Sequence, residues 1–349
     1  MNAICNEWAF VELPEEVSKP GYCARLKYWL YGMRPAARAW EEEYAGKLVS
    51  EGYVQGNSVP TVFRHAKKEI SGAVHGDDFT FLGYEEDLVE LVKHLESWFE
   101  LKVRATLGPE PKDDKEIVIL GRLVRWEAGG IRIIPDRKYA ESIMKYCGVS
   151  GESKSLGGPG KKEESEEIED PEEEEDGEDR EKEDLKELAP KEAKEFRGMA
   201  ATANYLGADR VDVQYSAKEL CRMMSRPTKM SFRKLKHLAR YLVGVPEVEI
   251  YFVHQKDTKE LVCYVDSDWA GCTRTRKSTS GGIGTLGAHY EGRACEGGRA
   301  LKRSLGRAPL PRPVFSIYVC MSSSFVVLSP DQKKVGGKFC KITLAYFAD

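Results

Sequence analysis

Apolar residues in the first part of the chain recur at helical spacing in two segments. Within residues 35–53, Trp40, Tyr44 and Leu48 follow one another at intervals of four, so they share one face of a helix. Residues 85–101 place five apolar side chains on one face in the same way: Leu88, Leu91, Val92, Leu95 and Phe99. Both segments are therefore predicted to be amphipathic helices.

Strand patterns lie between and after these two helices. Residues 69–83 contain two short apolar runs around Gly76-Asp77, which is a common β-hairpin signal. Residues 115–135 predict two further strands joined at Gly129-Gly130, and residues 137–147 predict another helix. This order of elements favours an antiparallel sheet with helices on one side, which is an α+β domain.

A strongly acidic segment follows this first part. Residues 163–187 hold 17 acidic and 3 basic residues, a net charge of −14, so the rest of the chain has 50 basic and 40 acidic residues, or +10. Like charges at this density repel one another and leave few apolar residues to bury, which predicts a disordered linker over residues 151–190. An acidic interaction tail is the alternative interpretation. The mildly basic remainder permits a nucleic-acid partner.

Beyond the linker, helical spacing returns within residues 191–246 and predicts three helices. Residues 248–254 and 260–271 are predicted to pair with each other as strands, and residues 278–287 are a candidate third strand. Residues 288–349 begin with a stretch rich in Arg, Gly and Pro that has no sustained period, so a poorly ordered tail is expected there.

Cysteine usage and hydropathy bear on the compartment. The nine cysteines stand singly, without a C-x-x-C pair or a secretory leader, which favours reduced thiols in an intracellular protein. The expected location is cytoplasmic or nuclear, and the chain is not expected to be secreted. The longest apolar stretch, residues 314–330, is shorter than the roughly 20 residues of a membrane helix, so no membrane partner is expected. The pattern does not indicate an oligomeric state.

The corner at Gly76, Asp77 and Asp78 has two interpretations. As a structural feature, it is the polar turn of the predicted hairpin. As a chemical feature, two adjacent carboxylates at a tight turn can serve a pair of Mg²⁺ ions, which stabilise the attacking and leaving oxygens in phosphoryl transfer. Such a site usually needs a further carboxylate from a neighbouring strand. The local pattern leaves both interpretations open.

Several linked motifs resemble the reverse transcriptase and ribonuclease H region of Ty1/copia-type retrotransposon polyproteins. KYWLYGMRPAARAW, residues 27–40, followed by VHGDDF, residues 74–79, is similar to the family's LYGLKQAPRAW and YVDD segments. Later stretches resemble, in the family's order, the end of the polymerase domain, the connection and the start of ribonuclease H: residues 119–149, 196–228 and 262–282. A lone GDD is a weak signal, because viral RNA polymerases also use it.

The resemblance implies an architecture of three parts. Residues 1–150 would form an α+β polymerase palm with part of the thumb, and residues 191–246 the helical connection. Residues 247–287 would begin an incomplete α/β ribonuclease H-like domain. The implied partners are an RNA template, a DNA primer, an RNA–DNA hybrid and dNTP.

The same resemblance implies roles for individual residues. Asp77 and Asp78 would be the metal-binding pair of the palm, and Asp266 the first metal ligand of ribonuclease H, with Mg²⁺ or Mn²⁺ as cofactor. Arg34 and Arg38 would lie near the nucleotide and template, together with Gly76, and could meet phosphates. Ordinary helix-surface charge is the alternative interpretation of these arginines. In the ribonuclease H motif, Asp268 is expected to be structural and Trp269 to be a core residue.

Three departures from the family bear on activity. The family's first polymerase aspartate precedes the segment that FVELPEE, residues 10–16, resembles, so this chain is expected to start after it. His75-Gly76 replaces the usual Tyr-Val, and the likeness stops near Leu286 with no glutamate partner for Asp266. We therefore expect an RNA-directed DNA polymerase fragment with a partial ribonuclease H domain, weak or inactive as a catalyst. The alternative is a noncatalytic nucleic-acid-binding or interaction protein from the same element.

Overall fold

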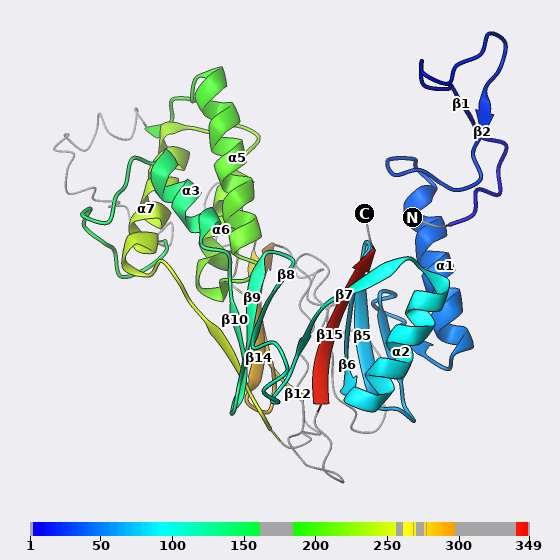
Figure 1. Cartoon of the computed structure of the whole chain (residues 1–349). Helices are drawn as coiled ribbons and strands as arrows, with labels where there is room; N and C mark the ends of the chain where they lie inside the picture. Colours follow the sequence, from blue (N-terminus) through cyan, green and yellow to red (C-terminus); the bar gives the residue numbers. More distant parts are fainter. Residues whose placement is uncertain are drawn as a thin grey trace. The chain divides into compact units, whose positions relative to one another are not determined.

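The chain forms two compact units, each with its own hydrophobic core. Unit 1 contains Met1–Lys115 and Ser316–Asp349, and unit 2 contains Glu116–Phe315 (Figure 1). The division falls after Lys115 rather than after residue 150. This computed structural model describes residues 3–160, 184–255, 261–267, 269, 276, 278–296 and 340–347. Most of the expected acidic linker, residues 161–183, lies outside the described residues.

Unit 1 is built on a six-stranded antiparallel sheet with the strand order β3-β4-β5-β6-β15-β7. Its strands are β3 (Val54–Gln55), β4 (Val62–His65), β5 (Ile70–His75), β6 (Asp78–Tyr84), β7 (Leu101–Leu107) and β15 (Cys340–Phe347). Two helices lie on one side of this sheet (Figure 1): α1 (Ala36–Ser50) and α2 (Glu85–Trp98). A short ribbon, β1 (Phe10–Val11) with β2 (Ala24–Arg25), precedes them.

The core of unit 1 follows from the apolar faces of its helices. Trp40, Tyr44 and Leu48 of α1 are buried, as are three leucines of α2, so the two predicted helices are confirmed. The ring of Trp40 packs edge-on against Phe79 of β6, with centroids 6.3 Å apart. Such aromatic contacts add to the hydrophobic gain of burying both rings, and they fix α1 against the hairpin strands.

The described parts of residues 288–349 correct the expectation of a poorly ordered tail, because residues 289–296 and 340–347 both form strands, the latter as β15. Strand β15 lies between β6 and β7 and pairs with both. The five residues 341–345 are all buried. A short alternation such as KITLAYF carries little signal by itself, because the strand is stabilised by ladder partners in β6 and β7, which are distant in sequence.

Within the described residues, unit 2 combines a helical bundle with two antiparallel sheets. The helices are α3 (Lys138–Tyr146), α5 (Pro190–Leu206), α6 (Gln214–Arg222) and α7 (Lys229–Gly244), with a short 3₁₀ turn at Val211–Val213. One sheet has the order β11-β10-β9-β8 and the other β12-β13-β14. Their strands are β8 (Glu116–Ile119), β9 (Arg122–Glu127), β10 (Gly130–Ile134), β11 (Ile250–Val253), β12 (Leu261–Ser267), β13 (Thr279–Leu286) and β14 (His289–Glu296).

A buried ion pair joins β9 to the segment that follows α5 within unit 2. Arg122 of β9 donates to Asp209, next to the helical bundle, with Nε and Oδ1 2.8 Å apart. Both side chains are less than 5% exposed. Burial raises the pKa of Asp209 while Arg122 opposes that rise. Because an unpaired buried charge is costly, this pair ties β9 to the bundle.

The pairing of β11 differs from the sequence expectation. The strand at 250–253 pairs with β10, whereas β12 pairs with β13. Gly130 permits this pairing, since a Cβ there would lie 2.2 Å from the carbonyl oxygen of Phe252. The glycine pair at 129–130 therefore does more than form a turn: it also leaves room for the backbone of β11.

Candidate functional site

The Gly76-Asp77-Asp78 corner is the turn of a hairpin, as the sequence predicted. His75 at the end of β5 pairs with Asp78 at the start of β6, which leaves Gly76 and Asp77 as a two-residue loop. Gly76 has a φ of +62° at the first loop position. This geometry favours glycine, because a side chain there would meet the backbone. Asp77 is exposed at the tip, whereas Asp78 is partly buried.

Two aromatic side chains contact this tip. The indole nitrogen of Trp40 in α1 donates to the carbonyl oxygen of Gly76 over 2.7 Å. Trp40 is 4% exposed, so its packing in the core of unit 1 fixes the position of this donor. The hydroxyl of Tyr31 donates to the carboxylate of Asp77, and burial together with that carboxylate raises the pKa of Tyr31. The loop is thus positioned from outside its own strands.

The groups around Asp78 shift its pKa in both directions. Burial raises the pKa of Asp78, and the neighbouring carboxylate of Asp77 raises it further, while Arg104 and His75 lower it. Two carboxylates that repel each other are stabilised when a cation binds between them. A divalent ion held by this pair would take its remaining ligands from water and phosphate oxygens. Across the described ranges, no group of three or more His, Cys, Asp or Glu residues is arranged to hold a metal.

The structure places the two sequence-predicted arginines at the surface near α1. Arg34 is exposed in the turn before the helix. Arg38 lies on the helix, where its Nε is 2.8 Å from Oε1 of Glu42. This exposed pair one helical turn apart matches the helix-surface interpretation of Arg38.

Asp266 belongs to unit 2. It lies in β12 opposite Gly281 of β13, and it is exposed. The core role expected for Trp269 is wrong, since this side chain is 93% exposed. Asp268 lies outside the described residues. Asp266 is therefore a single carboxylate on a strand.

Two site residues were missed from the sequence. Tyr31 lies within the LYG motif at residues 30–32, and this motif is the sequence feature that could have indicated it. Arg104 had no such signal. It lies in β7 where the register with β15 shifts: Leu344 is opposite Ala105 and Ala345 is opposite Val103. An irregularity of this kind redirects a side chain, and no local pattern predicts it.

Comparison with known proteins finds relatives of this chain in plants. The retrovirus-related Pol polyproteins from transposons RE1 and RE2 of Arabidopsis thaliana are 26% and 27% identical to it, over 275 and 277 residues. Each match covers 78% of this chain, and the chain spans 17% of the length of either polyprotein. An uncharacterized mitochondrial protein of Arabidopsis thaliana is 35% identical over 98 residues, which are 28% of this chain and 40% of that protein.

No family model and no solved structure matches the chain. A search of the described residues for helices that could cross a membrane finds none of sufficient length and apolarity.

Proposed function

We propose, from the premise that this chain is related to the Pol polyproteins of retrotransposons, that residues 1–150 derive from a reverse transcriptase palm with part of its thumb. The Pol polyprotein relatives confirm the resemblance that the sequence motifs indicated. In the same proposal, residues 247–287 derive from the start of a ribonuclease H domain, with Asp266 as its first carboxylate. The observation that carries the proposal is the hairpin with Asp77 and Asp78 at its tip, held by Trp40.

The proposed partners follow from the chemistry of the tip. Mg²⁺ or Mn²⁺ held by Asp77 and Asp78 would supply charge neutralisation on phosphate oxygens. Trp40 donates to the Gly76 carbonyl and so anchors the loop that carries Asp77. Arg34 is exposed and suits a backbone phosphate of a DNA primer, an RNA template or a dNTP. An RNA–DNA hybrid is the corresponding partner of Asp266.

We further propose that the 349-residue chain binds nucleic acid and metal with little or no turnover. Phosphoryl transfer by two metal ions needs enough carboxylates to hold both ions against their mutual repulsion. In the described part of the chain, Asp77 and Asp78 are the carboxylates at the hairpin tip. Loss of one member of such a set costs orders of magnitude in rate, because the ions are misplaced as well as weakly held.

Primer extension on an RNA template, with dNTP and either Mg²⁺ or Mn²⁺, tests this function. We expect no measurable extension and no cleavage of an RNA–DNA hybrid, but salt-dependent binding of primer–template. Mn²⁺ binding, followed by its electron paramagnetic resonance signal, is expected to fall at least tenfold in Asp77→Asn. The matched control is Glu96→Gln, which removes an exposed carboxylate of α2. Template-dependent incorporation that Asp77→Asn abolishes would contradict the proposed lack of turnover.

A noncatalytic nucleic-acid-binding protein is the second candidate function, and one cluster favours it. Trp8 and Phe10 are exposed near β1, with ring centroids 6.2 Å apart, and the guanidinium of Arg25 lies 3.9 Å above the Trp8 ring. Exposed rings beside a cation suit the stacking of single-stranded bases. Oligothymidine binding that drops in Trp8→Ala and is unchanged by Asp77→Asn would favour this candidate.

A further inference from the structure

Strand β15 fills a slot whose two walls are β6 and β7. Its residue Leu344 is opposite Thr80 of β6 and also opposite Ala105 of β7. Ile342 and Leu344 are at most 5% exposed, so the strand belongs to the interior of unit 1. If the slot were empty, the facing backbone groups of β6 and β7 would lack their ladder partners, which is costly inside a sheet.

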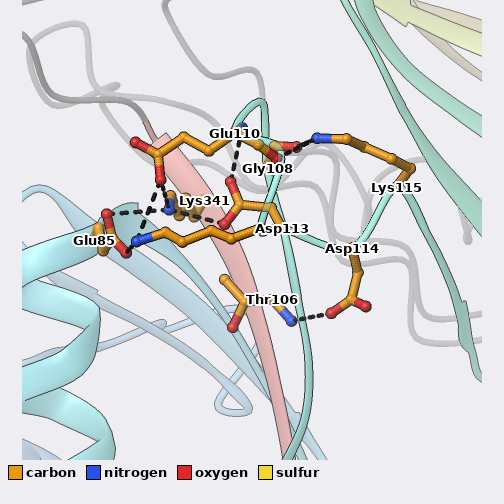
Figure 2. A network of polar contacts seen from close by, with 9 residues as sticks. Glu85, Thr106, Gly108, Glu110, Asp113, Asp114, Lys115 and Lys341 are labelled. Carbon is orange, nitrogen blue, oxygen red and sulfur yellow. Dashed lines mark hydrogen bonds and ion pairs between the residues drawn. The ribbon is translucent and has the colours of Figure 1, made fainter.

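Lys341 is the unusual residue of this strand (Figure 2). Its side chain is 1% exposed, and its ammonium lies 2.8 Å from Glu110, 2.9 Å from Asp113 and 3.1 Å from Glu85. Burial opposes the charge, yet hydrogen bonds to these three carboxylates hold the pKa of Lys341 above its ordinary value. A buried ammonium is stable only when it is paired and hydrogen-bonded in this way.

The loop after β7 is shaped to receive a lysine. One oxygen of Asp113, Oδ2, accepts the backbone N–H of Glu110 over 2.9 Å, which leaves Oδ1 for Lys341. Lys115 donates to the carbonyl oxygens of Gly108 and Glu110, over 2.8 and 2.6 Å. These bonds stay within the loop, and the bond from Glu110 orients the carboxylate of Asp113.

Gly108 leaves the space for the lysine stem. A Cβ at this position would lie 2.4 Å from Oδ2 of Asp113 and 3.0 Å from Cγ of Lys341. At the other end of the loop, Oδ2 of Asp114 accepts the backbone N–H of Thr106 over 3.0 Å and anchors the loop to β7 (Figure 2). The carboxylates, the open space and the anchored loop together form a receptor for one extended lysine side chain.

We propose that the slot between β6 and β7 is a peptide-binding site that recognises an extended segment by one buried lysine, and that residues 340–347 of this chain are its ligand. The backbone ladder accepts any extended strand, because its hydrogen bonds do not depend on side chains. Glu85, Glu110 and Asp113 supply the selectivity at position 341. This recognition is independent of the function proposed for Asp77 and Asp78.

The test uses the full 349-residue chain and fluorescein-labelled peptides of residues 337–349. A Lys341→Met chain still carries residues 340–347 but lacks the recognition residue, so an added peptide with the lysine can displace its own, more weakly held strand. We expect this chain to bind the natural peptide at least tenfold more tightly than a peptide carrying Lys341→Met, measured by fluorescence anisotropy. The matched control chain is Lys93→Met, which removes an exposed lysine of α2 and is expected to exchange no peptide.

Equal affinity for the two peptides, or no binding of either, would overturn the proposal. A second measurement does not depend on the folding of the Lys341→Met chain. Thr106 of β7 is opposite Thr343 of β15, so a Thr106→Cys, Thr343→Cys chain is expected to form that disulfide within one molecule. Mass spectrometry of proteolytic peptides identifies the bond. A link between two molecules, or an equal yield from an off-register Thr106→Cys, Ala345→Cys chain, would contradict residues 340–347 as the ligand in the same chain.

Discussion

Replacing glycine by alanine is expected to change the free energy of unfolding in opposite directions at Gly76 and Gly46. Gly76 has a φ of +62° in the hairpin loop, whereas Gly46 lies inside α1 with open space around it. Gly76→Ala is expected to lower the free energy of unfolding by about 1–2 kcal/mol, the cost of a side chain in the left-handed region. Gly46→Ala is expected to raise it by about 0.5–1 kcal/mol. Urea denaturation followed by circular dichroism measures both, and shifts of the same sign would contradict this assignment.

Asp78 allows a sharper test of the site at the residue scale. Burial and the charge of Asp77 raise the pKa of Asp78 from its ordinary value of 3.8, and Arg104 lowers it. Asp77→Asn should therefore lower the pKa of Asp78, because it removes a like charge. Arg104→Gln should raise it, because it removes an opposite charge. Carboxyl carbon NMR titration measures both, and movement in the same direction would show that Arg104 does not act on this carboxylate.

Individual residues of the site differ in how far the sequence predicted them. The sequence predicted Asp77 and Asp78 because Gly-Asp between two apolar runs is a local signal. The partners that hold them were not found, because Trp40 meets Gly76 across 36 positions of sequence. Trp40 was predicted as a core residue of a helix, and it is one, but its indole nitrogen also supports the loop.

At the scale of elements, the stabilisation of β15 by the carboxylates around Lys341 is expected to depend on pH. The pKa of Glu85 is lowered by its bonds with Lys112 and Lys341, and that of Glu110 by its bond with Lys341. Carboxyls with lowered pKa stabilise the fold above their unfolded value, 4.5, and lose this contribution as the pH falls through the folded pKa.

The stability of unit 1 in urea is therefore expected to decline below a pH of about 4.5, and Lys341→Met is expected to flatten that decline. Lys93→Met, which changes an exposed lysine, should keep the slope of the unmodified chain. An identical acid dependence in Lys341→Met and the unmodified chain would mean that the buried ammonium does not set these pKa values.

At the scale of the whole molecule, the two units have separate cores that can be perturbed one at a time. Phe63 of β4 and Phe196 of α5 are both fully buried, one in each unit. Phe63→Ala and Phe196→Ala should each lower the free energy of unfolding of their own unit by about 3–5 kcal/mol. Hydrogen exchange by mass spectrometry should show faster exchange across the unit that carries the substitution, and equal acceleration in both units for either variant would contradict separate cores.

The sequence alone determined the elements whose signals are local. Helical spacing of Trp40, Tyr44 and Leu48 fixes a buried face within four turns of chain, and Gly76-Asp77 fixes a turn within four residues. The motifs that predicted a retrotransposon relationship are likewise short and contiguous. Such features depend on neighbours in sequence, so reading the chain in order is enough to find them.

Only the tertiary structure decided which strands pair and where the units divide. β11 joins β10 because Gly130 admits its backbone, and β15 enters between β6 and β7 because loop carboxylates receive Lys341. Each choice depends on a complementary surface assembled from distant segments. A strand's own residues specify that it is extended and which face is apolar, but its hydrogen-bonding edges are alike in every strand, so the partner is set by packing and charge.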